Sequence, residues 1–155
     1  MRIALYQPDI PQNTGTILRL AACMNVTVDI IGPAGFDLSD RAFRRSGMDY
    51  IEHANFLRHI NWQSFQLWRS ETTVPQRLLL LTTTAQHSYV EFFFQPTDIL
   101  LFGSESAGVT DEIHNTVDKS LTIPMHYGFR SLNLAVSVAM VLGEALRQND
   151  SFVKP

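Results

Sequence analysis

The segment Pro11–Arg19 is the first of three that combine small, polar and charged residues in a pattern able to serve chemistry. Asn13 opens an expected helix, Gly15 allows a ligand or another chain segment close to the backbone, and Arg19 lies about one turn beyond. An amide and a guanidinium on one helix could bind and orient a phosphate or a hydroxyl group. Taken alone, however, the segment is better explained as an ordinary helix start followed by a surface arginine.

The second segment follows an apolar run that ends at Phe102. Gly103, Glu105 and Gly108 fall within six residues, so a carboxylate is held in a loop of small residues. Gly103 would let the flat face of a ligand lie on the backbone. A plain β-turn explains this composition about as well.

The third segment is Ile123-Pro124-Met125, which is followed after a short loop by Ser131-Leu132-Asn133. Ser131 and Asn133 are polar residues in the first turn of an expected helix that is otherwise apolar. Both residue types cap helices, and both can also contact a ligand.

These segments need a scaffold, and the hydrophobic pattern of the chain predicts an α/β fold with a parallel sheet flanked by helices. Ligands of such sheets bind beyond the carboxyl ends of the strands. Three expected strand ends therefore become candidate site loops, at Leu81-Thr82-Thr83, Gly103-Ser104-Glu105 and Ile123-Pro124-Met125. The expected strands are 2–6, 26–31, 56–59, 78–84, 99–103 and 121–124, and the expected helices are 13–24, a short one from 39 to 47, 62–69, 111–117 and 131–148.

In order and spacing, the three segments resemble the signature motifs of the SpoU-type RNA 2'-O-methyltransferases of the SPOUT superfamily. The corresponding patterns here are N-x-G-x-x-x-R, G-x-E-x-x-G and I-P-M followed by S-L-N. The resemblance covers nearly the whole chain, which is therefore expected to be a single domain, 1–155. It implies a C-terminal trefoil knot and S-adenosylmethionine as the cofactor.

The resemblance also assigns roles to residues. Arg19 would be the catalytic residue, either orienting the substrate or acting as a base, in an active site formed at a dimer interface. The assisting residues would be Asn13, Glu105 and Asn133. The cofactor would lie against Leu81, Gly103, Ile123 and Leu132, with Ser131 nearby, and we expect Gly103→Val to fill its space while leaving the fold largely intact.

The short chain, with no appended RNA-binding domain, is similar to family members that methylate the ribose of the tRNA wobble nucleotide, cytidine or modified uridine, in the anticodon loop. Arg41, Arg44 and Arg45 have i, i+3 and i+4 spacing, so they share one face if their segment is helical. We expect this cluster to bind tRNA phosphates although the net charge is -3. A solvated helix face is the simpler alternative.

The last expected helix is apolar in nearly every direction, which indicates burial on all sides. A second copy of the chain is the simplest cover, so we expect a homodimer that a charged residue at Val138 or Leu142 would disrupt.

Other classes of protein are disfavoured. No signal peptide, membrane span, P-loop or nucleophile elbow is recognisable, so a cytoplasmic enzyme is expected. His53 and His59 lack partners at metal-ligand spacing, and the single cysteine, Cys23, is expected in the core. Methylation of a base or of another RNA, and a non-catalytic tRNA-binding protein, remain as alternatives.

Overall fold

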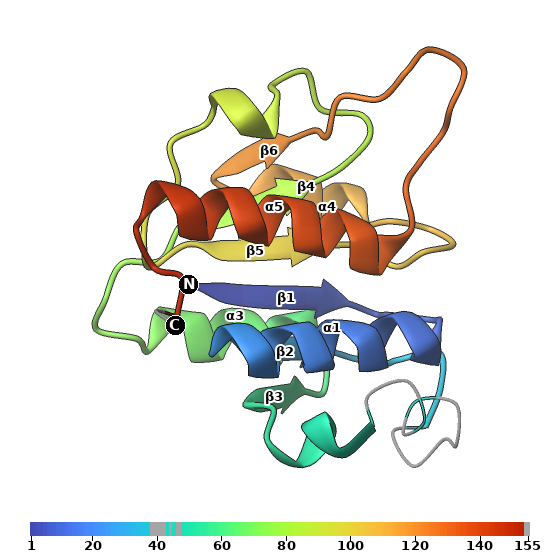
Figure 1. Ribbon diagram of the computed structural model, residues 1–155, viewed down its shortest axis with the longest axis vertical. Helices are drawn as coiled ribbons and strands as arrows, with labels where there is room; N and C mark the ends of the chain where they lie inside the picture. The colour runs from blue at the N-terminus through green and yellow to red at the C-terminus, as the bar shows by residue number, and fades with distance from the viewer. Residues whose placement is uncertain (38–42, 44, 46–47, 154–155) are drawn as a thin grey trace.

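The computed structural model describes residues 1–37, 43, 45 and 48–153. Within them the chain forms one six-stranded sheet in the order β3-β2-β1-β5-β4-β6, in which every neighbouring pair is parallel (Figure 1). The predicted parallel α/β sheet is therefore confirmed. The strands are β1 (Arg2–Tyr6), β2 (Thr27–Ile31), β3 (Phe56–His59), β4 (Leu78–Leu81), β5 (Ile99–Phe102) and β6 (Lys119–Leu121).

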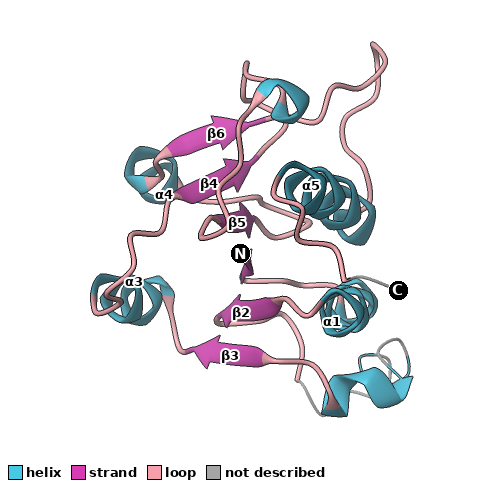
Figure 2. Ribbon diagram, turned by 60° about the vertical axis from the view of Figure 1, so that its left-hand side comes forward, coloured by secondary structure: helices cyan, strands magenta, loops and turns pink. Residues whose placement is uncertain are grey.

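Helices cover both faces of this sheet. Figure 2 shows α1 and α5 on one face and α3 and α4 on the other. Each face has its own apolar core: Leu18 and Val141 belong to the first, and Phe65 and Ile113 to the second. The helices are α1 (Pro11–Met24), α3 (Trp62–Ser70), α4 (Asp111–Thr116) and α5 (Leu134–Gln148), with short 3₁₀ helices η1 (Met48–Glu52) and η2 (Tyr89–Glu91).

The neighbouring strands β4 and β5 have the apolar sequences Leu-Leu-Leu-Leu and Ile-Leu-Leu-Phe because helices bury the sheet on both sides. Helix α1 begins at Pro11, whose fixed φ suits the first turn, and ends where Asn25 adopts a left-handed conformation with φ 52°. Local sequence thus sets the ends of α1, which brings Asn13 just beyond the end of β1.

Three expected boundaries are wrong by three residues each. Strand β4 ends at Leu81, because the hydroxyls of Thr82 and Thr84 bond each other in a turn, 3.1 Å apart. Strand β6 ends at Leu121 and not at Pro124, a residue without an N–H for the ladder. Helix α5 begins at Leu134, because the side chain of Asn133 caps it.

Within the single chain, helix α5 is buried on one side and exposed on the other, so cover by a second copy stays a prediction. Val138 and Leu142 have 0% and 1% of their surface exposed, so they belong to the protomer core, and a charge there would disrupt the fold itself. The opposite side of the helix carries Val136 and Met140, which are 48% and 40% exposed, with Ala139 exposed between them. These three residues are called the α5 stripe below.

Cys23 is exposed on α1, so the prediction that it lies in the core is wrong. The expected helix from Ser39 to Gly47 falls mostly outside the described residues, although Phe43 and Arg45 within it are helical.

Candidate cofactor and catalytic site

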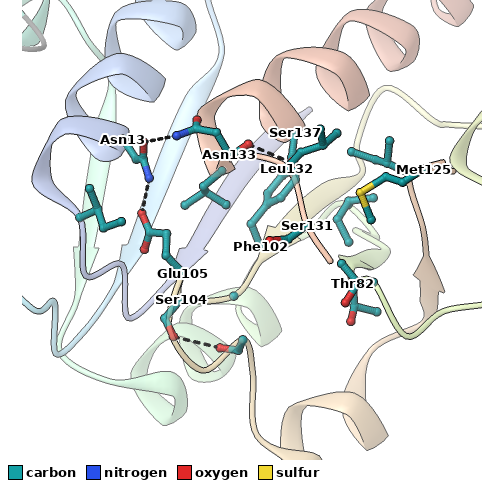
Figure 3. Close-up of a pocket in the computed structure, with 17 residues that line it drawn as sticks. Asn13, Thr82, Phe102, Ser104, Glu105, Met125, Ser131, Leu132, Asn133 and Ser137 are labelled. Atoms are coloured by element: carbon teal, nitrogen blue, oxygen red, sulfur yellow. Dashed lines mark hydrogen bonds between the residues drawn. The ribbon is translucent and has the colours of Figure 1, made fainter. Parts of the chain in front are cut away.

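A cavity of about 450 Å³ opens at the carboxyl ends of β4, β5 and β6, against the first turns of α1 and α5 (Figure 3). Its size is within the range of small-molecule sites, and its position is the one that parallel sheets favour. The lining is Ile10, Asn13, Leu81, Thr82, Thr83, Phe102, Gly103, Ser104, Glu105, Gly108, Ile123, Met125, Ser131, Leu132, Asn133, Leu134 and Ser137.

The three sequence segments meet in this cavity. All five residues expected to hold a cofactor line it, namely Leu81, Gly103, Ile123, Ser131 and Leu132. Three of the four expected catalytic residues, Asn13, Glu105 and Asn133, line it as well. The segments lie together because α1 follows β1, the Gly103–Gly108 loop follows β5, and α5 starts after the loop that leaves β6.

Asn133, Asn13 and Glu105 form a continuous hydrogen-bonded chain across the cavity wall (Figure 3). Asn133 Nδ2 donates to Asn13 Oδ1 at 2.9 Å, and Asn13 Nδ2 donates to Glu105 Oε1 at 2.9 Å. At the Asn133 end of this chain of hydrogen bonds, Asn133 Oδ1 accepts hydrogen bonds from the backbone N–H groups of Ala135 and Val136, which caps α5. The side chains of Asn13 and Glu105 are therefore fixed by the ends of two helices.

Asp9 extends this chain, and sequence reasoning missed it. Its backbone N–H donates to Glu105 Oε2 at 3.0 Å, and its Oδ2 accepts the N–H and the hydroxyl of Ser106. Burial raises the pKa of Glu105, and a shared hydrogen bond with Asp9 raises it further while lowering the pKa of Asp9. Asp9 follows β1, so inspecting that strand end as well would have found it.

Of the two carboxyl groups, Glu105 binds a proton more readily, because its pKa is raised and that of Asp9 is lowered. The buried atom Asp9 Oδ1 has no hydrogen-bond partner among the described residues.

Gly103 is packed against Gly108 of the same loop. Ser104 and Gly108 exchange backbone hydrogen bonds of 3.0 and 2.9 Å, and a Cβ built on Gly103 would lie 2.4 Å from the carbonyl carbon of Gly108. The expectation that Gly103→Val leaves the fold intact is therefore wrong, because valine would displace this loop. Glycine is needed at position 103 because the backbone of Gly108, in the same loop, packs directly against it.

Arg19 lies apart from the other expected catalytic residues. Its side chain is exposed on α1, with the guanidinium carbon 5.0 Å from the centre of the Tyr50 ring, and it does not line the cavity. Among the expected RNA-binding arginines, Arg45 is exposed, whereas Arg41 and Arg44 fall outside the described residues. Glu105 is thus the one acidic or basic side chain among the described residues of the cavity wall.

Among the described residues, no group of three or more His, Cys, Asp or Glu side chains is placed to hold a metal ion. No helix in this part of the chain is long and apolar enough to cross a membrane.

Known proteins are similar to this chain in both sequence and fold. One relative, the tRNA (cytidine(34)-2'-O)-methyltransferase of Beijerinckia indica, is 53% identical over 152 residues, which is 98% of this chain and 94% of the relative. The Escherichia coli K12 protein of the same name is 38% identical over 96% of this chain and 93% of its own length.

Solved structures agree with these relatives. A structure described as giving insights into the 2'-OH methylation of C/U34 on tRNA has a TM-score of 0.90 and 36% identity, and covers 96% of this chain and 95% of its own. The SpoU methyltransferase AviRb from Streptomyces viridochromogenes, in complex with the cofactor AdoMet, has a TM-score of 0.89 at 25% identity over 99% of this chain and 59% of its own. A family model, the SpoU rRNA methylase family, matches residues 1–143. The chain therefore belongs to the SpoU rRNA methylase family.

Proposed function

We propose that this chain transfers a methyl group from S-adenosylmethionine to the ribose 2'-hydroxyl of the wobble nucleotide, cytidine 34, of tRNA. The observation that carries the proposal is the meeting of the three motif segments in one cavity. The name of the relative that is 53% identical over 98% of the chain supplies the substrate. A modified uridine at the same position is a second substrate, in keeping with the C/U34 structure.

The chemistry of the cavity wall fits this cofactor. Leu81, Ile123 and Leu132 offer apolar surface for a flat nucleoside, and the Ser131 hydroxyl and the Gly103 backbone offer hydrogen-bonding groups. Glu105 provides negative charge beside a ligand that carries a positive sulfonium. When bound, S-adenosylmethionine supplies the electrophilic methyl group.

The protein's own contribution is orientation of the substrate. Asn13, Glu105 and Asn133 form a hydrogen-bonded wall that is in place before the substrate arrives, which lowers the cost of reaching a reactive geometry. We assign Arg19 to binding the 2'-hydroxyl and its neighbouring phosphate, because a guanidinium keeps its protons at neutral pH. Action of Arg19 as a base is the alternative role.

Assembly as a homodimer completes this proposal. The α5 stripe leaves apolar surface uncovered, and Arg19 lies outside the cavity of its own chain. A site at the interface of two copies accounts for both features.

We further propose that the chain is a single domain, 1–155, with a C-terminal trefoil knot. We also propose that the protein is cytoplasmic and that Arg41, Arg44 and Arg45 bind tRNA.

Mass spectrometry of tRNA nucleosides tests the function. Purified protein incubated with S-adenosylmethionine and unmodified tRNA is expected to add one methyl group to the ribose of nucleotide 34. The same mark is expected to be missing from tRNA of a strain that lacks the protein. Methylation of a base or of ribosomal RNA instead, or cofactor-independent binding of tRNA without methylation, would contradict the proposal.

A further inference from the structure

The loop between β6 and α5 contains a tight turn that displays aromatic rings. The N–H of Phe129 donates to the carbonyl of His126 at 3.3 Å, and Gly128 has a φ of +93°, as the third position of a type II turn requires. The rings of His126 and Phe129 meet edge to face with their centres 6.2 Å apart. We call residues 126–129 the aromatic turn.

The aromatic turn holds its rings out in solvent. Tyr127, at the second position of the turn, is 97% exposed, and Phe129 is 73% exposed. Figures 1 and 2 both show the loop that carries the turn extending away from the sheet. A turn fixed by its own hydrogen bond and glycine keeps an apolar ring in water, which is the arrangement expected of a surface that a partner covers.

The turn is joined at both ends to the wall of the cavity. Met125, just before it, and Ser131, two residues after it, both line the cavity. Two residues of extended chain span at most about 7 Å, so the backbone of Tyr127 lies within that distance of Met125. The turn therefore lies next to the part of the cavity wall that Met125 forms.

The chemistry of this loop matches an unpaired nucleotide. Aromatic side chains stack on unpaired bases of any sequence, and a guanidinium binds the phosphate. The loop combines Tyr127 and Phe129 with the exposed Arg130. By contrast, the α5 stripe is purely aliphatic and lies on a separate element, which suits a second copy of the chain better.

We propose that Tyr127 stacks on an unpaired base beside the nucleotide to be methylated, while Arg130 binds the RNA backbone. The inference rests on the proposed function, because it takes the substrate to be a single-stranded RNA loop. It adds that the turn, which lies outside the motif residues, supplies substrate affinity.

Three variants of the whole protein test this inference with a fluorescently labelled anticodon stem–loop RNA. Tyr127→Ala is expected to weaken RNA binding by about 10-fold, as the loss of one stacked base predicts. Tyr127→Phe keeps the stacking ring and is expected to bind like the wild type. Phe93→Ala removes a ring that is 85% exposed but does not line the cavity, so it is the matched control and is expected to leave RNA binding unchanged.

Calorimetry with S-adenosylmethionine and sedimentation are measured on the same samples, and neither is expected to change in Tyr127→Ala. Wild-type RNA affinity in Tyr127→Ala would overturn the inference while leaving the proposed function standing. A fall in sedimenting mass would overturn it too, because the turn would then contact a second copy. A wild-type protein that fails to methylate this RNA would contradict the proposed function and the inference together.

Discussion

The backbone N–H of Asp9 donates to Glu105 Oε2, the two side chains also interact, and their pKa values move in opposite directions. Glu105 binds its proton more tightly than a carboxyl in water does, and Asp9 less tightly. The pair adjoins a cavity proposed to hold a cation, so its protonation state sets the charge that the ligand meets.

The substitution Asp9→Asn is expected to lower the pKa of Glu105 toward its ordinary value. The desolvation of Glu105 persists in this variant, but the neighbouring carboxylate that favours the protonated form is gone. Carbon NMR of the labelled Glu105 carboxyl measures the titration directly, and its midpoint should move to lower pH. Ser106→Ala keeps the charge of Asp9, so it serves as the control in which the pKa of Glu105 stays raised. An unmoved midpoint in Asp9→Asn would show that the two carboxyls are not coupled.

Arg19→Ala is expected to reduce single-turnover methylation by about 100-fold or more, the range found when a group that acts on the reacting atoms is removed. Cofactor binding should be nearly intact, because Arg19 does not line the cavity. Arg19→Lys should rescue little, since an ammonium cannot reproduce the planar fork. Arg58→Ala, another exposed arginine, is the matched control. Near-normal turnover of Arg19→Ala with saturating tRNA and cofactor would refute the catalytic assignment.

At the scale of elements, Asn133 has two separable tasks. Its Oδ1 caps α5, and its Nδ2 donates to Asn13, which ties α5 to α1. Asn13 cannot turn its amide to compensate, because its own Nδ2 is engaged by Glu105.

Substitutions at Asn133 should separate these tasks. Asn133→Ala loses both and is expected to lower the free energy of unfolding by about 1 kcal/mol, the usual worth of such a cap. Asn133→Asp keeps a capping oxygen but has no donor for Asn13, so it should retain most of the stability and still slow methyl transfer. Chemical denaturation and single-turnover rates are the two measurements. Equal rates for wild type and Asn133→Asp would show that the bond to Asn13 is dispensable.

The elements themselves could be predicted from sequence, because runs such as Leu78–Leu81 between turn residues read as buried strands. The orientation of α5 could not. Its apolar residues occur on every side, so the pattern does not distinguish Val138, which packs on the protomer, from Met140, which does not. The tight contact of Gly103 with Gly108 was equally hidden, since closure of a loop on itself depends on backbone geometry.

For the whole molecule, the α5 stripe predicts how the proposed dimer is broken. Met140→Arg puts a charge on the exposed side of α5 and should give folded monomers, whereas Val138→Arg puts one into the core and should unfold or aggregate the chain. Sedimentation reports the assembly, and circular dichroism reports the fold. A wild-type monomer at micromolar concentration, or a Met140→Arg dimer, would refute the proposed interface.

The site residues lie together because of the order of the strands in the sheet, and the hydrophobic periodicity of the sequence does not encode that order. Parallel strands predict that loops meet at one edge, and this was enough to group Leu81, Gly103 and Ile123. That β1 lies directly beside β5 was not predictable, and it is this pairing that brings Asp9 against Glu105. Long-range neighbours of this kind are set by the packing of the whole sheet.

The place of β1 in the sheet has a consequence for synthesis of the chain. The first half can pair β1, β2 and β3 as soon as they leave the ribosome, but the other edge of β1 stays open until Ile99–Phe102 is made. The side chain of Asn13 can form its hydrogen bonds with Glu105 and Asn133 only after the later half of the chain, which contains both residues, has been synthesised. A stalled chain would thus expose an aggregation-prone strand edge while holding no methyl-transfer site, so the site comes into being only as the last helix docks.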